Sequence, residues 1–460
     1  MLFNSYEFIF IFFPILIAVH TLLKNYTLSW SHNLLILASL LFYALLDYQH
    51  LVILLFSALI NYAIGNRLTC KDENKPWVIA GIVFNLGLLG GYKYTSFLAS
   101  TIGIDIPSIA APLGISFFTF HQLAYLIDIY QKRIQPTNFR DYALYVTFFP
   151  HLIAGPIMRY GQFSPQLQTA PLSIPYQAAI FFFSIGLFKK VVLADTFAPM
   201  ADRIFDAVKV GQTVHFFEAW MGLFAYTWQI YFDFSGYADM AIGLGLFFGI
   251  ALPINFNSPY KATSISDFWR RWHISLSQFL RDYLYIPLGG NRYGYIRQMV
   301  ALLLTMSLAG LWHGASWNFV IWGMMHGLLL VISHSWQITL GKKITIPPLL
   351  GWAITFMCVI LLWVLFRAET ISEALWYYTI LLHPSLHFPI PAFQSLQIIV
   401  AGVIVFWAKP VIFWTNYTIP YPLTILSHPQ IYGIISGIVF WIALKCMSGE
   451  VSRSFVYFVF

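Results

Sequence analysis

Charged residues are scarce in this sequence: Asp, Glu, Lys and Arg together make up 9% of its 460 residues. A soluble globular chain carries about 25% charged residues. A chain of this length therefore lacks the charge to cover a water-facing surface, and a soluble globular protein is excluded. The formal net charge of +7 is modest. In a membrane protein it indicates basic cytosolic loops and not nucleic-acid binding.

Cysteine is also scarce, with Cys70, Cys358 and Cys446 lying far apart in the chain. No two of them have the spacing of metal ligands, which argues against a zinc site and against a disulfide framework. The first apolar segment, residues 7–23, lacks a basic start and a small-residue cleavage site. We interpret it as a retained first membrane span and not as a signal peptide.

Apolar residues are abundant: 59% of the chain is hydrophobic and the mean hydropathy is +0.71. Apolar runs recur from end to end at about 20 residues, the length that crosses a hydrocarbon core of about 30 Å. We therefore predict an all-α polytopic protein with about 11–13 membrane helices, forming one domain over residues 1–460. The predicted spans lie near 6–23, 33–47, 49–65, 77–99, 110–130, 141–158, 174–195, 216–250 (long enough for two), 298–318, 319–340, 350–367, 394–414 and 428–447.

Lysine and arginine predict how the chain is oriented. They occur in the connections after the first, third and fifth spans and are absent from the connections between those. The positive-inside rule then places the amino terminus outside and the odd-numbered connections in the cytosol. Lys93, near the outer end of the fourth span, does not fit this pattern.

The stretch 259–297 is too charged for a span. It holds six basic residues against two acidic ones, and charges are costly at the bilayer centre. Ser264 and Asp267 form a capping-box start, and Pro287-Leu288-Gly289-Gly290 forms a stop. An interfacial or re-entrant helix on the cytosolic side is the interpretation that fits.

Two histidine motifs carry the candidate chemistry. His313 lies in Trp312-His313-Gly314 within an apolar run, where ionisable groups are rare and line cavities. Imidazole suits proton transfer near neutral pH, and Gly310 and Gly314 allow close approach of a substrate or a helix. A histidine hydrogen-bonded to a neighbouring helix is the alternative.

The second motif runs from Phe268 to Leu280. On a continuous helix, His273 and Ser277 share a face, and Arg270 precedes them by one turn. Arg270, Arg271 and Ser277 are candidates for binding an anionic donor. The alternative is a basic helix that rests on phospholipid headgroups.

Together the two motifs resemble the membrane-bound O-acyltransferase family. That family pairs an intramembrane Trp-His-Gly histidine with an upstream histidine or asparagine. Here the two histidines lie forty residues apart. Further stretches resemble its bacterial polysaccharide O-acetyltransferase branch, so that the resemblance covers nearly the whole chain: 1–5, 114–117, 148–156, 231–237 and 281–290.

The resemblance implies a central funnel, with the core in residues 119–340 and His313 at the neck. His313 would act as general base on an acceptor hydroxyl, and His273 would orient or polarise the reacting groups. The expected donor is a cytosolic acyl thioester, acetyl-CoA, with no bound cofactor or metal. The expected partners are a periplasmic acetyltransferase and an exported polysaccharide such as alginate or peptidoglycan, and the expected location is the bacterial inner membrane.

Other polar groups in apolar segments need separate interpretations. His326 follows His313 by thirteen residues, about 220° around an unbroken ideal helix, so we assign it a structural or supporting role. His121 and His151 are interpreted as packed, hydrogen-bonded residues. Asp233, Tyr237 and Asp239 are placed in a loop-like segment, where buried carboxylates must pair or be hydrated.

The chain ends in an aromatic tail, residues 455–460. An interfacial anchor is one interpretation, because tyrosine favours headgroup depth. The tail also resembles the ending of bacterial members of the family, and a similar ending occurs on the small partner of the related teichoic-acid D-alanylation system. That resemblance implies a transient acyl carrier at Tyr457.

For the whole chain, the main alternative function is a transporter or flippase, which the absence of a repeat in the sequence disfavours. The third possibility is a catalytically dead scaffold, which the two intact motif histidines disfavour.

Overall fold

The computed structural model describes residues 1–24, 27–68, 74–107, 109–168, 174–339, 341, 344–385, 392–411, 413, 429–448, 453 and 455–456. Helix accounts for 77% of the structure, and the described residues form no strand. The all-α prediction is therefore confirmed.

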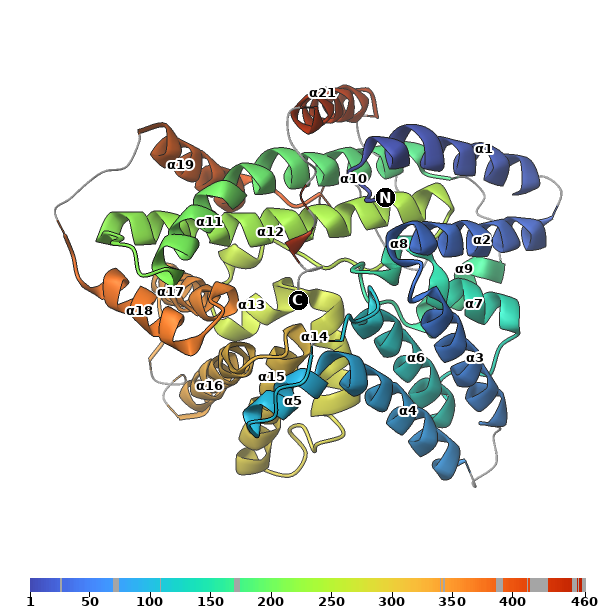
Figure 1. Ribbon diagram of the computed structural model, residues 1–460, viewed down its shortest axis with the longest axis horizontal. Helices are drawn as coiled ribbons and strands as arrows, with labels where there is room; N and C mark the ends of the chain where they lie inside the picture. Colours follow the sequence, from blue (N-terminus) through green and yellow to red (C-terminus); the bar gives the residue numbers. More distant parts are fainter. Residues whose placement is uncertain are drawn as a thin grey trace. The chain divides into compact units, whose positions relative to one another are not determined.

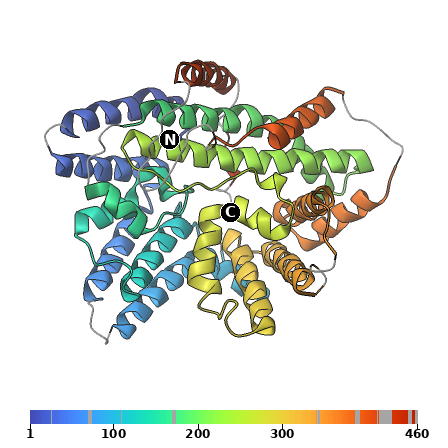
Figure 2. The ribbon, with the colours of Figure 1, turned by 180° about the vertical axis from the view of Figure 1, so that it is seen from behind.

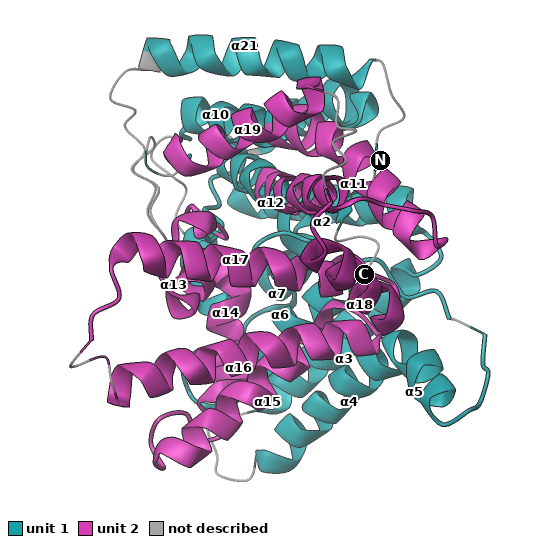
Figure 3. Cartoon of the chain, turned by 90° about the vertical axis from the view of Figure 1, so that its left-hand side faces the viewer, with its two compact units in different colours: residues 1–188, 237–254, 411–459 teal, residues 189–236, 255–410, 460 magenta. Residues whose placement is uncertain are grey.

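The chain divides into two compact units, shown in teal and magenta in Figure 3. Unit 1 comprises Met1–Phe188, Tyr237–Ile254 and Val411–Val459, and unit 2 comprises Lys189–Gly236, Asn255–Pro410 and Phe460. The long helix α12 (Phe216–Phe247) passes from one unit to the other after Gly236. Both sequence motifs lie in unit 2.

Unit 1 contains most of the amino-terminal helices and one late helix. A buried amide cluster links three of them: Asn61 donates to Gln122 Oε1 at 2.5 Å, and Asn85 donates to Asn61 Oδ1 at 2.5 Å. The late helix α21 packs along α10, as Figure 1 shows. The elements are the π-helix η1 (Phe8–Phe12), α1 (Phe13–Lys24), α2 (Leu28–Asp47), α3 (Leu51–Arg67), α4 (Lys75–Lys93), α5 (Thr95–Thr101), α6 (Ile115–Tyr130), α7 (Phe139–Thr147), α8 (Phe149–Leu152), α9 (Tyr160–Gln168), α10 (Tyr176–Phe188) and α21 (Pro429–Met447).

Unit 2 is built around an antiparallel pair, α15 (Tyr295–His313) and α16 (Trp317–Thr339). The two helices run side by side in Figure 1, and Figure 2 shows them from behind in gold and orange-brown. The remaining elements are the π-helix η2 (Lys189–Ala194), α11 (Asp195–Lys209), the 3-10 helix η3 (Pro259–Lys261), α13 (Ile265–Arg271), α14 (Ile274–Leu280), the π-helix η4 (Arg281–Tyr285), α17 (Pro348–Arg367), α18 (Ile371–Leu382) and α19 (Ala392–Trp407).

Six described helices are long and apolar enough to cross a membrane: Leu28–Asp47, Tyr176–Lys209, Tyr295–His313, Trp317–Thr339, Pro348–Arg367 and Gln430–Met447. Shorter apolar helices occupy Phe8–Leu23, Leu51–Arg67 and Ala392–Trp407. The chain is thus a multi-pass membrane protein. The predicted total of 11–13 spans and the central funnel stay predictions.

One predicted span, 141–158, is wrong in detail. The structure has two short helices there, α7 and α8, which are separated at Phe148 (φ −53°, ψ 106°). Pro150 lies in the first turn of α8. Proline is tolerated at a helix start but interrupts a helix interior because it has no N–H donor. The segment predicted at 216–250 is the single helix α12 of 32 residues.

Candidate active site

His313 is the last residue of α15, and its side chain is buried with 3% exposure. Three aromatic rings surround the imidazole. Its centroid lies 4.8 Å from that of Trp312, 5.2 Å from Trp322 of α16 and 5.3 Å from Phe366 of α17. All three rings meet it at steep angles of 69–90°. The imidazole therefore occupies an apolar cage contributed by three helices.

Glycines allow α16 to approach α15 within one turn of His313. A Cβ atom on Gly310 would lie 2.1 Å from the Phe319 carbonyl oxygen, and one on Gly323 would lie 2.2 Å from the Met306 carbonyl oxygen. Small residues at such positions permit close backbone contact between membrane helices. The expectation for Gly310 is therefore confirmed, and the partner is a helix.

A hydrogen bond joins the start of α16 to the end of α17, the two helices that supply Trp322 and Phe366 to the cage. Asn318, buried in the first turn of α16, donates from Nδ2 to the Ala368 carbonyl oxygen at 2.7 Å, just beyond the end of α17. Asn318 follows the Trp312-His313-Gly314 motif by four residues in the sequence. Its amide therefore ties the start of α16 to the end of the helix that supplies Phe366.

The second motif is not the continuous helix that the sequence predicted. Its capping-box start is confirmed, since Ser264 Oγ accepts from the Asp267 N–H at 3.1 Å. However, α13 ends at Arg271, Trp272 is extended, and His273 adopts a left-handed conformation (φ 43°, ψ 55°) as the N-cap of α14. Arg270 therefore belongs to a different helix from Ser277, and the shared face predicted for Arg270, His273 and Ser277 is wrong.

Asn255 holds this break in place. Its carbonyl oxygen accepts from the Ile274 N–H at 3.0 Å, and its side-chain oxygen accepts from the Ser275 N–H at 3.2 Å and from the Ser275 hydroxyl at 2.6 Å. A non-glycine residue in the left-handed region costs roughly 1–3 kcal/mol and persists where its surroundings determine it. Strain of this kind clusters at functional sites. Sequence reasoning missed Asn255, for which the only signal was an amide in an apolar stretch.

The break brings His273 into the same aromatic cluster as His313. The His273 ring lies 4.7 Å from Phe234 of α12 and 6.2 Å from Trp312, whose ring also contacts His313. His273 is fully buried. Burial lowers the pKa of its imidazole to about 3, so the ring is neutral at physiological pH. Both motif histidines thus contact the Trp312 indole.

His326 lies next along the same row of rings. Its centroid is 4.7 Å from Trp322 and 5.1 Å from Trp269 of α13. It is fully buried, and neither ring nitrogen has a hydrogen-bond partner within the described ranges. The unbroken helix assumed for its placement is wrong, because α15 and α16 form a hairpin. The Trp322 indole stands against both His313 and His326.

The candidate donor-binding residues lie near the break but are differently engaged. Arg270 is exposed. Arg271 is held by Asp267, with Nε 2.9 Å from Oδ1. Ser277 Oγ donates to the Trp272 carbonyl oxygen at 3.4 Å. Arg270 is therefore the side chain of the three most accessible to an anion, and donor binding by any of them stays a prediction.

A buried ion cluster includes Asp233, the residue before Phe234. Lys190 Nζ is 2.8 Å from Asp233 Oδ1 and 2.8 Å from Asp195 Oδ1, and the Lys190 and Asp233 side chains are each 2% exposed. Asp233 precedes Phe234, whose ring contacts His273. The loop predicted around Asp233 is wrong because the segment is part of α12; one glycine costs a helix only about 1 kcal/mol. The predicted pairing of the buried carboxylate is confirmed for Asp233.

In unit 1, His121 and His151 are packed residues, as predicted. Their rings lie 4.5 Å apart. His151 Nε2 is 2.8 Å from the Tyr145 carbonyl oxygen, and His121 Nε2 accepts from the Met158 N–H at 3.4 Å. Both are fully buried.

Tyr457, the predicted acyl carrier, lies outside the described residues. Two residues earlier, Phe455 is 1% exposed and its ring meets that of Tyr237 edge-on at 4.4 Å. Phe455 is therefore packed inside unit 1, which does not fit an interfacial anchor at this position. The role of Tyr457 itself stays a prediction.

Comparison with known proteins shows the family to which the chain belongs. The model of the membrane-bound O-acyltransferase family matches residues 18–366. The chain is 42% identical over 416 residues to a peptidoglycan O-acetyltransferase of Helicobacter pylori, covering 82% of this chain and 78% of that protein.

Two further relatives come from other systems. A probable alginate O-acetylase, AlgI, of Pseudomonas aeruginosa is 40% identical over 390 residues, covering 81% of this chain and 73% of that protein. A teichoic acid D-alanyltransferase of Streptococcus thermophilus is 31% identical over 246 residues, covering 51% and 59% respectively. The chain belongs to the membrane-bound O-acyltransferase family and is an acyltransferase of the membrane.

Proposed function

We propose that this enzyme is an O-acetyltransferase that takes an acetyl group from a cytosolic thioester, acetyl-CoA, and passes it across the inner membrane toward an exported cell-envelope polysaccharide. Membership of an acyltransferase family favours this function over a transporter or flippase. The similarity to a peptidoglycan O-acetyltransferase and to a probable alginate O-acetylase supports a polysaccharide acceptor.

The observation that carries the proposal is the pair of motif histidines around Trp312. Acyl transfer needs a base that takes the proton of the acceptor hydroxyl while its oxygen attacks the thioester carbonyl. The C–S bond then breaks, and CoA leaves as the thiol after taking up a proton. An imidazole in its neutral form is able to accept such a proton, and the ring cage around the buried His313 excludes water that would hydrolyse the thioester.

In this proposal His313 is the general base, and His273 donates or accepts a hydrogen bond that orients the reacting groups. The buried Trp322 indole adds a further candidate donor. Its N–H has no hydrogen-bond partner within the described parts of the chain, and its ring lies 5.2 Å from His313. Indole can only donate, which suits the negative oxygen of the tetrahedral intermediate.

The test replaces His313 by alanine and measures transfer from labelled acetyl-CoA by the purified protein. We expect loss of at least about 10²-fold, the lower range for a general base, with unchanged yield and thermal stability. His383→Ala is the matched control, because His383 is exposed and bonds only the Thr379 carbonyl oxygen of its own helix in the hydrogen bonds described. A His313→Ala enzyme with near wild-type turnover would exclude His313 as the base.

The acceptor and the partner require an experiment in cells. Deletion of the gene should remove O-acetyl esters from one envelope glycan, which hydrolysis and mass analysis of each purified glycan would identify. In the deletion strain, a periplasmic acetyltransferase partner should still be present but should lack its acyl donor. Unchanged ester content in every exported glycan would contradict the proposed acceptor class.

The proposal includes a carrier step at Tyr457. A phenol with a pKa near 10 is a weak nucleophile until a base removes its proton. The aryl ester that forms is a better acyl donor than an alkyl ester, which favours onward transfer. Tyr457→Phe keeps the ring and removes the oxygen, so a carrier role predicts loss of glycan acetylation with CoA binding retained. An active Tyr457→Phe enzyme, or a carboxyl-terminal peptide without an added acetyl group, would exclude the step.

A further inference from the structure

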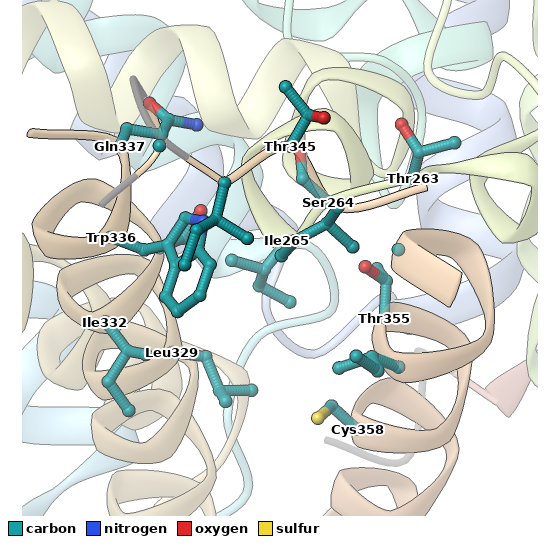
Figure 4. Close-up of a pocket in the computed structure, with 16 residues that line it drawn as sticks. Thr263, Ser264, Ile265, Leu329, Ile332, Trp336, Gln337, Thr345, Thr355 and Cys358 are labelled. Atoms are coloured by element: carbon teal, nitrogen blue, oxygen red, sulfur yellow. The ribbon is translucent and has the colours of Figure 1, made fainter. Parts of the chain in front are cut away.

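A cavity of about 470 Å³ lies in unit 2, between the start of α13, the second half of α16 and the first half of α17. We call it the α16–α17 cavity. Figure 4 shows its lining side chains. Its volume is within the range of about 300–1,000 Å³ that small-molecule sites occupy. Neither motif histidine lines it.

The lining changes in polarity from one end to the other. Gln337, Thr345 and Thr263 lie at one end in Figure 4, and Leu329 and Cys358 lie at the other. The α16–α17 cavity therefore matches an amphiphile with one polar and one apolar end. A uniformly polar ligand, such as a nucleotide, would leave the apolar end without suitable contacts.

The two helices that form its walls are candidate membrane spans. The polar end coincides with the last turn of α16 and with the segment just before α17, where spans reach the headgroups. From Gln337 to Leu329 along α16 is about 12 Å at 1.5 Å per residue. Half of a hydrocarbon core measures about 15 Å. The apolar end thus reaches to the depth of one leaflet.

The cavity also opens sideways to the apolar surface. Two of its lining residues, Ile332 of α16 and Ile354 of α17, are 54% and 49% exposed. On spans of a membrane protein such exposed apolar side chains face lipid. A ligand enters from the bilayer by this route without leaving an apolar environment.

We propose that the α16–α17 cavity binds one acyl chain of a membrane glycerophospholipid, with the glycerophosphate region at Gln337, Thr345 and Thr263. The bound chain fills the space between α13, α16 and α17. The same three helices supply Trp269, Trp322 and Phe366 to the row of rings around His313 and His326. Phospholipid therefore stabilises the spacing of the elements that form the cage.

The experiment uses Cys358, which lines the cavity, as a reporter in the full-length protein with Cys70 and Cys446 replaced by serine. The protein is purified in detergent and treated with an uncharged maleimide, alone and with added phosphatidylglycerol, phosphatidylethanolamine or acetyl-CoA. We expect either phospholipid to slow labelling at Cys358 about tenfold. Unchanged labelling with lipid would overturn the proposal, and protection by acetyl-CoA alone would assign the cavity to the donor instead.

Two tryptophan variants provide the matched comparison. Leu329→Trp places a large ring in the apolar end of the cavity, whereas Leu328→Trp adds the same ring at an exposed neighbour that does not line it. Native mass spectrometry should show one phospholipid fewer on Leu329→Trp and an unchanged number on Leu328→Trp. Equal lipid retention by both variants would also overturn the proposal. If Leu329→Trp does not fold, protection of Cys358 by phospholipid in the protein without a tryptophan substitution decides whether the cavity binds lipid.

The effect on catalysis rests on the proposed acetyltransferase function. Removing lipid should lower turnover and thermal stability together, and adding phospholipid should restore both in the Leu328→Trp protein but not in the Leu329→Trp protein. Cys358 protection and lipid counting need no turnover. Failure of the proposed acetyltransferase function therefore leaves these two results unchanged. Failure of the lipid site is detected by these two measurements without any activity assay.

Discussion

Replacing Gly310 by alanine should inactivate the enzyme although Gly310 bears no reactive group. The added Cβ would lie 2.1 Å from the Phe319 carbonyl oxygen and 3.0 Å from Gly323 Cα. Both obstacles are backbone atoms of α16, so no side-chain rotation relieves the overlap. Real Cβ contacts stay beyond 3.0 Å, and the two helices must therefore separate by about 1 Å at this point.

The consequence for His313 follows from its place one turn further along α15. Overpacking of this kind costs about 1–3 kcal/mol in stability. A misplacement of about 1 Å at a reacting group can cost about 10²-fold in rate. We therefore expect a modest drop in melting temperature and a roughly hundredfold loss of kcat, with a much smaller change in donor KM.

The assay is release of free CoA by the purified variant, with the melting temperature measured on the same preparation. Gly323→Ala should give a similar loss, because its Cβ would lie 2.2 Å from the Met306 carbonyl oxygen. Gly87→Ala is the control, since a Cβ on this glycine of α4 meets nothing within 4 Å. A Gly310→Ala enzyme with wild-type kcat would refute the link between this helix contact and the position of His313.

Further predictions concern the residues around the cage. His273→Asn should retain more turnover than His273→Ala, because an amide still forms hydrogen bonds; equal and complete loss in both would indicate proton transfer at His273. Burial lowers the pKa of His273 to about 3, so between pH 6.5 and 3 this histidine is protonated in the unfolded chain but neutral in the folded protein. The free energy of unfolding should therefore fall over this range by up to about 1.4 kcal/mol per pH unit as the pH is lowered. The melting temperature of His273→Asn should depend less on pH than that of the wild type, and parallel curves would contradict this. Trp322→Phe should lower kcat more than it raises donor KM, and unchanged kcat would exclude the indole N–H as a donor. Lys190→Met should cost about 3–5 kcal/mol by removing the cation from a buried ion pair, whereas Lys190→Met with Asp233→Leu should recover much of it; equal melting temperatures for both variants would contradict the pairing.

The sequence predicted the elements that depend on local patterns. Long apolar runs gave α2, α15, α16 and α17 within a few residues, because a span must satisfy its own backbone. The capping box at Ser264 marked the start of α13 correctly, since this signal lies within four residues. The two histidine motifs pointed to the residues that the structure gathers around Trp312.

Features that depend on distant contacts could not be predicted in this way. The break at His273 opposes local helix propensity and is held by Asn255, about twenty residues earlier in the chain. Lys190 precedes Asp233 by 43 residues in the sequence, and only the fold brings the two side chains together. Trp322 and Phe366 were two among many aromatic residues, and nothing in their spacing showed that both contact His313.

Two ion pairs lie next in sequence to the aromatic residues that contact the motif histidines. Lys190 and Asp233 pair immediately before Phe234, and Arg367 pairs with Asp202 at 3.0 Å immediately after Phe366. The two aromatic residues contact His273 and His313 respectively. Each ion pair thus involves a residue that is adjacent in sequence to one whose apolar ring lies against an imidazole. A carboxylate in the place of either ring would favour the protonated imidazole, which has no lone pair left to accept the proton of an acceptor hydroxyl. We therefore expect the charges of these two ion pairs to act on the helices, and the apolar surroundings to favour the uncharged form of His273, whose pKa burial lowers.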